Sequence, residues 1–284
     1  MHRWPPEPPV PLPRGCVVHV PGRGEMFVRD TGGDGPPVLL LHGWMFSADL
    51  NWYCTYAPLA DAGYRVLALD HRGHGRGLRS PEPFTLKACA DDAAALLAYM
   101  KVPPVMAVGY SMGGPIASIL ARDHPQLVAG VVLGATAMDW SGRRMRTFWR
   151  TMAVLRLALG LAPETLWQRG LRAAGFPPSA ITTWTAAELS RGNSVDIAEA
   201  GRELGRFNSR SWIAGVDAPG AVIVTTEDTG VPPPRQRALA AAMRAPVFEV
   251  DGDHGAVIVR AREFNAQLLA ALDAVRDPRA AATT

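Results

Sequence analysis

The sequence predicts an α/β fold: a doubly wound, mostly parallel sheet of eight strands, interrupted by a helical insertion. Short apolar runs alternate with longer helical patterns along most of the 284 residues. Most of the short runs are continuously apolar, which is typical of strands that are covered on both faces, as in a parallel sheet. The eight runs expected as strands are residues 17–20, 26–29, 38–41, 65–69, 105–108, 131–133, 221–224 and 247–250.

The connections between these strands agree with the same fold class. The first two runs are expected to form a hairpin, because the turn residues Pro21-Gly22-Arg23-Gly24 join them. Helical patterns fill the connections between later strands, and the predicted helices cover residues 85–100, 112–123, 235–243 and 260–275. Strands that alternate with helices in this way predict a doubly wound sheet.

One stretch, residues 138–210, breaks the alternation because it contains no convincing strand. It carries four of the eight tryptophans, and eleven Arg against six Asp and Glu. We predict that it forms a helical cap, or lid, inserted between the two parts of the core, residues 1–137 and 211–284. Two interpretations of its Arg excess stay open: attraction of an anionic substrate or lipid surface, or a solvated helix face. Residues 1–14 contain six prolines and are expected to form a flexible arm.

The composition excludes several classes of function. The net charge is only +3 and the Arg residues are spread along the chain, so we expect no nucleic-acid partner. No apolar run reaches the roughly 18 residues that a membrane span needs, and no signal peptide is recognisable, so we expect a cytoplasmic protein without integral membrane association. Cys16, Cys54 and Cys89 are odd in number and widely spaced. They predict neither a metal site nor a disulfide framework.

A candidate nucleophile follows the predicted strand 105–108. That strand runs directly into Gly109-Tyr110-Ser111-Met112-Gly113-Gly114, and a helix of small and apolar residues comes next. This is a G-x-S-x-G pattern in its required setting of strand, sharp turn and helix. The turn exposes the serine hydroxyl, and the helix N-terminus offers free N–H groups to a developing oxyanion.

With this motif the sequence resembles the α/β-hydrolase superfamily, over about residues 17–275. Four motifs occur in the order of that family. They are His42-Gly43-Trp44 after the third strand, Asp70-His71-Arg72-Gly73-His74-Gly75 after the fourth, the Ser111 turn, and Gly252-Asp253-His254 after the last strand. Each motif is modest alone, but together and in order they are specific.

The resemblance implies a site as well as a fold. Ser111 would be the nucleophile, His254 the general base and Asp228 the acid of a catalytic triad. The oxyanion hole would use the backbone N–H groups of Trp44 and Met112. Such a site needs no metal and no organic cofactor.

The acid is the triad member with an open alternative. Asp228 stands four residues before the proline of a Val-Pro pair, as in the family's acid loop, but its neighbour Glu227 could take its place. The chain departs from the family pattern at Thr225, where glycine is common. It departs again at Gly77, where a serine often follows the turn after the fourth strand.

These residues predict a carboxylic-ester hydrolase of the esterase or lipase kind, acting on a small-molecule ester with an apolar acyl group. Three alternatives stay open: a thioesterase or C–C bond hydrolase on the same triad, a cofactor-free perhydrolase or haloperoxidase-like enzyme, and a non-catalytic ligand-binding protein. An aspartate in place of Ser111 would instead have suggested dehalogenation or epoxide opening. We expect a monomer, with a dimer left open.

Overall fold

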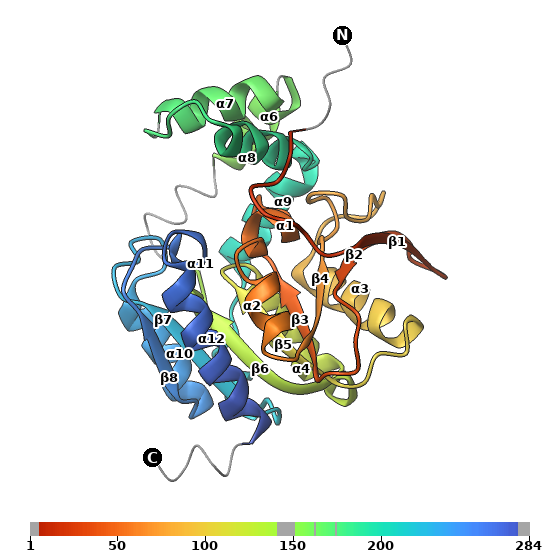
Figure 1. Ribbon diagram of the computed structural model, residues 1–284, viewed down its shortest axis with the longest axis vertical. Coiled ribbons are helices and arrows are strands. Elements are labelled where there is room, and N and C mark those ends of the chain that lie inside the picture. The colour runs from red at the N-terminus through yellow and green to blue at the C-terminus, as the bar shows by residue number, and fades with distance from the viewer. Residues whose placement is uncertain (1–5, 141–150, 162, 174, 278–284) are drawn as a thin grey trace.

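A computed structural model describes residues 6–140, 151–161, 163–173 and 175–277 (Figure 1). In this part of the chain, eight strands form one sheet with the order β1-β2-β4-β3-β5-β6-β7-β8. Strand β2 pairs antiparallel with β1 and β4, and all other pairs are parallel. The strands are β1 Gly15–Val20, β2 Gly24–Asp30, β3 Pro37–Leu41, β4 Arg65–Leu69, β5 Val105–Tyr110, β6 Val128–Gly134, β7 Gly220–Thr225 and β8 Val247–Val250. The predicted mostly parallel sheet of eight strands is confirmed.

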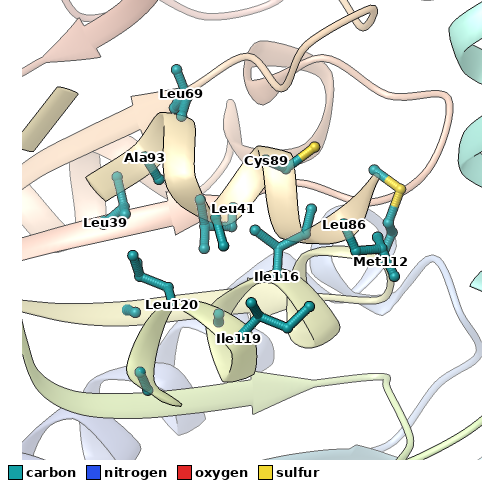
Figure 2. Packing of buried hydrophobic residues seen from close by; sticks show 14 of the residues in the cluster. Leu39, Leu41, Leu69, Leu86, Cys89, Ala93, Met112, Ile116, Ile119 and Leu120 are labelled. Carbon is teal, nitrogen blue, oxygen red and sulfur yellow. The ribbon is translucent and has the colours of Figure 1, made fainter. Parts of the chain in front are cut away.

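Both faces of the sheet are covered, which explains why its strands are apolar without alternation. Leu39 and Leu41 of β3 belong to one buried cluster, together with residues of α3 (Leu86–Tyr99), α4 (Gly113–Asp123) and α10 (Pro233–Met243). Val38 and Leu40 belong to a second cluster, with residues of α1 (Ala48–Trp52), α2 (Tyr56–Asp61), α11 (Ala256–Val259) and α12 (Ala261–Arg276). Figure 2 shows the first cluster, in which Ile116 and Leu120 of α4 face the sheet residues.

The helices predicted from periodicity are present, and each begins and ends within two residues of its expected bounds. Helix α3 begins where Thr85 accepts a hydrogen bond from the N–H of Ala88, at 2.9 Å. This N-cap satisfies a backbone donor that the first helical turn would otherwise leave unpaired. The short helices α1, α2 and α11 lie outside the predicted set, as do two single 3₁₀ turns, Pro125–Leu127 and Ile213–Gly215.

The described residues between β6 and β7 contain four helices: α6 (Met152–Leu161), α7 (Pro163–Ala173), α8 (Ala180–Ser190) and α9 (Ser194–Arg206). The two ends of this segment meet, because Asp139 and Asn208 form an antiparallel bridge and Ser209 N–H donates to Met138 O at 2.8 Å. In Figure 1, helices α6, α7 and α8 gather at one end of the molecule, and α9 lies between them and the core. Helix α8 contacts α1 and α9 contacts α3, so the segment packs onto the core. Residues 141–150, 162 and 174 of the predicted cap lie outside the described residues.

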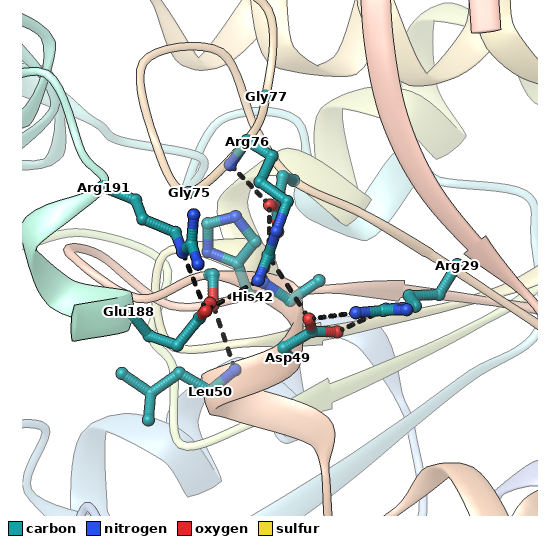
Figure 3. Close-up of polar contacts among 12 residues, drawn as sticks. Arg29, His42, Asp49, Leu50, Gly75, Arg76, Gly77, Glu188 and Arg191 are labelled. Atoms are coloured by element: carbon teal, nitrogen blue, oxygen red, sulfur yellow. Dashed lines mark hydrogen bonds and ion pairs between the residues drawn. The ribbon is translucent and has the colours of Figure 1, made fainter. Parts of the chain in front are cut away.

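A network of charged side chains attaches α8 to the core (Figure 3). Glu188 of α8 is only 2% exposed. One of its oxygens accepts from Arg76 at 2.6 Å and from Arg191 at 2.9 Å, and the other accepts from the Ser47 hydroxyl at 2.8 Å. Arg76 also lies 3.2 Å from the carboxylate of Asp49. The buried acid on the helix is therefore compensated by cations from both sides.

The arm before β1 forms neither helix nor strand in its described part, residues 6–14. Leu12 nevertheless packs against buried core residues, and the carbonyl of Pro13 accepts from Arg29 at 2.7 Å. Residues 1–5 of the predicted arm lie outside the described residues.

Three further findings concern disulfide bonds, metal sites and membrane-spanning helices. All three cysteines are free thiols. Within the described ranges, no group of three or more His, Cys, Asp or Glu side chains is arranged to hold a metal ion. No helix among the described residues has the length and apolar character that crossing a membrane requires.

Candidate active site

Ser111 lies at the carboxyl end of β5, directly before α4, with a backbone φ of +53°. This left-handed conformation is unusual for a residue other than glycine and makes the turn sharp. A Cβ on Gly109 would lie 2.2 Å from the carbonyl of Gly113, and a Cβ on Gly113 would lie 2.0 Å from the carbonyl of Leu41. Both positions of the motif therefore require glycine, because the backbone segments around the serine are in direct contact.

The loops after β7 and β8 bring Asp228 and His254 to Ser111. The Ser111 Oγ lies 2.9 Å from His254 Nε2, and His254 Nδ1 lies 2.7 Å from Asp228 Oδ2. Asp228 is 2% exposed, whereas the side chain of His254 is 40% exposed. The imidazole is thus held by a buried carboxylate on one side and is accessible to solvent on the other.

Glu227, the alternative acid, has its side chain on the surface. Its backbone N–H donates to the carbonyl of Gly252 at 2.9 Å, and its neighbour Asp228 is buried. The carboxylate in contact with the imidazole ring is that of Asp228. The geometry therefore favours Asp228 over Glu227.

The carboxylate of Asp228 is held by several donors besides the histidine. Its Oδ1 accepts from the backbone N–H groups of Gly230 and Val231, each at 2.8 Å. Its Oδ2 accepts from the hydroxyl of Thr225 at 3.0 Å. These donors on both oxygens restrict rotation of the carboxylate and set its direction toward His254.

The loop after β3 lies beside the serine. A Cβ on Gly43 would lie 3.4 Å from the Cβ of Ser111, so the backbone next to Trp44 adjoins the predicted nucleophile. The indole N–H of Trp44 donates to the carbonyl of Ile197 in α9 at 2.7 Å. Met112 occupies the N-cap position of α4. The two residues predicted for the oxyanion hole thus lie on the two segments that border Ser111.

His42 braces this loop. Its Nε2 accepts from the backbone N–H of His71 at 3.0 Å, so the ring proton resides on Nδ1. That proton is donated to the carbonyl of Gly43 at 2.8 Å. The histidine thereby joins the loop after β3 to the turn after β4.

Three buried histidines form a cluster behind the loop. The ring centroid of His42 lies 4.1 Å from that of His71 and 5.5 Å from that of His74. Burial lowers the pKa of His71 to about 3 and that of His74 to about 4, and it holds the pKa of His42 well below the usual value. All three rings are therefore neutral near pH 7.

The cluster predicts a loss of stability in mild acid. As the pH falls below the unfolded pKa of about 6.5, the unfolded chain binds protons that the folded rings do not bind. The associated stability is present above pH 6.5 and declines below it, by up to about 1.4 kcal/mol per histidine and pH unit. Burial raises the pKa of Asp70 to about 6 and also raises that of Asp196, and both changes act in the opposite direction.

Substituting His71→Phe tests this account, because neither ring nitrogen of His71 has a hydrogen-bond partner in the described part of the chain. We expect the fall in Tm between pH 7 and pH 5 to be smaller in this variant than in the wild type. His19→Phe, at an exposed position on β1, serves as the control and should leave the fall unchanged. An equal effect of the two substitutions would contradict the assignment.

The departure at Gly77 has a steric reason. A Cβ at this position would lie 2.2 Å from the carbonyl of His71 and 2.5 Å from that of Asp70. The turn after β4 is folded too tightly here to accept a serine. The departure therefore affects packing around Asp70 and not the residues next to Ser111.

Two groups of residues around the site were not predicted. The hydroxyl of Tyr110 donates to the backbone carbonyl of His254 at 2.9 Å and so supports the loop that carries the imidazole. Thr225 and the fully buried Gln236 lie behind Asp228. Gln236 shares a helix face with the buried Leu239 and Ala240. A polar residue on the apolar face of a helix is the sequence signal that could have pointed to Gln236.

Comparison with known proteins identifies the family of the fold. The family profile described as alpha/beta hydrolase fold matches residues 36–261. The chain is similar to a non-heme haloperoxidase of Rhodococcus erythropolis, with 39% identity over 110 residues, which are 38% of this chain and 39% of that protein. A bifunctional esterase/perhydrolase of Acinetobacter calcoaceticus is 36% identical over 111 residues, covering 38% of this chain and 40% of that protein. The chain thus matches about two fifths of the length of these relatives.

A solved structure extends the likeness to the whole fold. A hydrolase from Pseudomonas aeruginosa superposes with a TM-score of 0.78 at 22% identity, covering 91% of this chain and 98% of that one. The profile match alone spans well over half of the sequence. The chain therefore belongs to the α/β-hydrolase family.

Proposed function

We propose that this protein is a serine hydrolase that cleaves a carboxylic ester through an acyl-enzyme intermediate. The observation that carries the proposal is the continuous pair of contacts from Ser111 to His254 and from His254 to Asp228, at 2.9 and 2.7 Å. A nucleophile, a base within hydrogen-bond reach and a third group that orients the base make up a nucleophilic site.

In the proposed mechanism, Ser111 attacks the ester carbonyl while His254 Nε2 takes its proton. Asp228 fixes the tautomer with the proton on Nδ1 and stabilises the imidazolium that forms. The alcohol leaves with a proton from His254, and water activated by the same imidazole then releases the acid. The N–H groups of Trp44 and Met112 would hold the oxyanion, and losing one such donor typically raises the barrier by about 3 kcal/mol.

The proposed substrate has an apolar acyl group, and the supporting observation is a cluster of apolar residues between core and cap. Leu50 and Tyr53 from the core pack with Trp184 and Leu189 of α8, and Met45 and Phe46 of the loop after Trp44 join them. The rings of Tyr53 and Trp184 meet edge to face, with centroids 5.3 Å apart. We propose that residues 138–210 act as a cap whose underside favours apolar groups.

A panel of p-nitrophenyl esters of increasing acyl length tests this substrate class. We expect kcat/KM to rise from acetate to butyrate and hexanoate, by up to about 0.8 kcal/mol of transition-state binding for each buried methylene. The activity should disappear in His254→Ala. A preference for acetate would contradict the apolar acyl site, and undiminished activity in His254→Ala would contradict the triad.

A second candidate function is perhydrolysis, in which hydrogen peroxide replaces water in attacking the acyl-enzyme. It is favoured by the similarity to a haloperoxidase and to an esterase/perhydrolase. Formation of peracetic acid from acetate esters and hydrogen peroxide, lost in Ser111→Ala, would support it. Thioesters and C–C bonds activated by a neighbouring carbonyl are further candidate substrates for the same triad.

A further inference from the structure

Behind the carboxylate of Asp228 lies a second layer of polar side chains, Thr225 and Gln236, both 0% exposed. The hydroxyl of Thr225 lies 3.0 Å from Asp228 Oδ2, and Gln236 Nε2 lies 2.9 Å from the same hydroxyl. A hydrogen-bonded row therefore runs from Gln236 through Thr225, Asp228 and His254 to Ser111. Two polar residues buried at this point are costly unless their hydrogen bonds are satisfied, and here they are.

The directions of these hydrogen bonds follow from the partners of the Gln236 amide. Its Oε1 accepts from the backbone N–H of Thr225 at 3.1 Å, and that group can only donate. Its Nε2 donates to the carbonyl of Val231 at 2.7 Å, and that group can only accept. The two contacts leave a single orientation of the amide, with the NH₂ group facing the hydroxyl of Thr225.

The hydroxyl of Thr225 has one proton, and its direction is now fixed. Because the hydroxyl accepts from Gln236, its own proton is free to be donated to Asp228 Oδ2. That oxygen is the one that faces His254 Nδ1 at 2.7 Å. Gln236 Nε2 also lies 3.4 Å from this oxygen. The donors from Thr225 and Gln236 limit how far the carboxylate can turn away from the imidazole, while Gly230 and Val231 hold Oδ1.

We propose that Thr225 and Gln236 are a positioning pair, which orients Asp228 and through it His254. The proposal rests on the function proposed above for Ser111, His254 and Asp228. A glycine at position 225 would supply no hydroxyl and would leave the buried NH₂ group of Gln236 with one fewer acceptor. Thr225, the departure from the family pattern, and Gln236, on the apolar face of α10, therefore act together.

The test compares the rate constant for labelling Ser111 by a fluorophosphonate with the fraction of enzyme that is finally labelled. Thr225→Val keeps the shape of the side chain and removes the hydroxyl. We expect it to lower both the labelling rate constant and kcat roughly tenfold or more, since the lost bond is to a charged group. KM should stay within about twofold and the labelled fraction should stay complete, because the residues that would contact the substrate are unchanged.

Three further variants separate positioning from packing. Thr225→Ser retains the hydroxyl and should restore most of the rate. Gln236→Met removes the amide at similar size and should lower the rate less than Thr225→Val does. Thr226→Val is the matched control, because the hydroxyl of Thr226 contacts Asp251 at 3.1 Å and takes no part in the row. It should label at the wild-type rate.

The outcomes distinguish this inference from the proposed function. Wild-type rates in Thr225→Val, or equal losses in Thr225→Ser and Thr225→Val, would overturn the positioning pair while leaving the triad intact. A loss confined to the labelled fraction would also overturn it, since that indicates misfolding. If the wild type itself fails to label at Ser111, the proposed function fails. In that case the downfield ¹H NMR signal of the proton between His254 and Asp228 tests the positioning pair independently of activity. A signal that changes in Thr225→Val but not in Thr225→Ser supports the pair, and an unchanged signal in Thr225→Val refutes it.

Discussion

Replacing Ser111 by alanine is expected to lower kcat/KM for ester hydrolysis by a factor on the order of 10⁴ or more, without unfolding the protein. The substitution removes the only atom that would form the acyl bond, Oγ, and leaves the imidazole of His254 with no nucleophile at 2.9 Å. Stability should change little, because the backbone bond from Ser111 N–H to the carbonyl of Gly134 remains.

The measurement is the hydrolysis rate of a p-nitrophenyl ester, with circular dichroism as the check on folding. Ser118→Ala is the matched control: Ser118 is also buried on the chain segment that follows β5, but its hydroxyl donates to the carbonyl of Gly114 within α4. It should retain activity within a fewfold of the wild type. Loss of activity in Ser118→Ala equal to that in Ser111→Ala would mean that the effect comes from the helix and not from the nucleophile.

Substituting Asp92→Asn is expected to lower the free energy of unfolding by about 3–5 kcal/mol. Asp92 of α3 receives two hydrogen bonds from Arg72, at 2.7 and 2.8 Å, and both side chains are only 4% exposed. The asparagine would leave the buried guanidinium with only one carboxylate nearby, that of the exposed Glu82 at 3.9 Å. A buried cation without its partner is costly because its desolvation is no longer offset.

The neighbouring Asp91 provides the control on the same helix. It pairs with Lys87, whose side chain is 60% exposed, so Asp91→Asn should change the free energy of unfolding by about 1 kcal/mol or less. Urea denaturation of the two variants and the wild type measures the difference. Equal effects at positions 91 and 92 would show that burial of the Arg72 pair does not dominate its energetics.

The sheet and its long helices could be predicted from the sequence because periodicity and burial agree along them. The continuous apolar run of β3 predicted coverage on both faces, and alternate residues of that strand do enter two different clusters. The short helix α1 could not be predicted in this way. All five of its residues are buried, the polar Asp49 and Asn51 included, so residue type does not distinguish an exposed side from a buried one.

The candidate site divides in the same manner. Ser111 and His254 lie within local motifs directly after strands, so the sequence alone is enough to predict them. The ion pair of Glu188 with Arg76 could not be predicted in this way, because the two residues are 112 positions apart and only the fold brings them together. Thr225 stood out as a departure, but the amide of Gln236 that gives it a role comes from another element.

The most direct test of the central claim is covalent labelling of the folded protein with a fluorophosphonate, followed by mass spectrometry of its peptides. We predict one equivalent of label on Ser111, and no label in Ser111→Ala or after prior inactivation by a second serine-directed reagent. Folded protein that stays unlabelled, or that carries the label on a residue other than Ser111, would contradict the account.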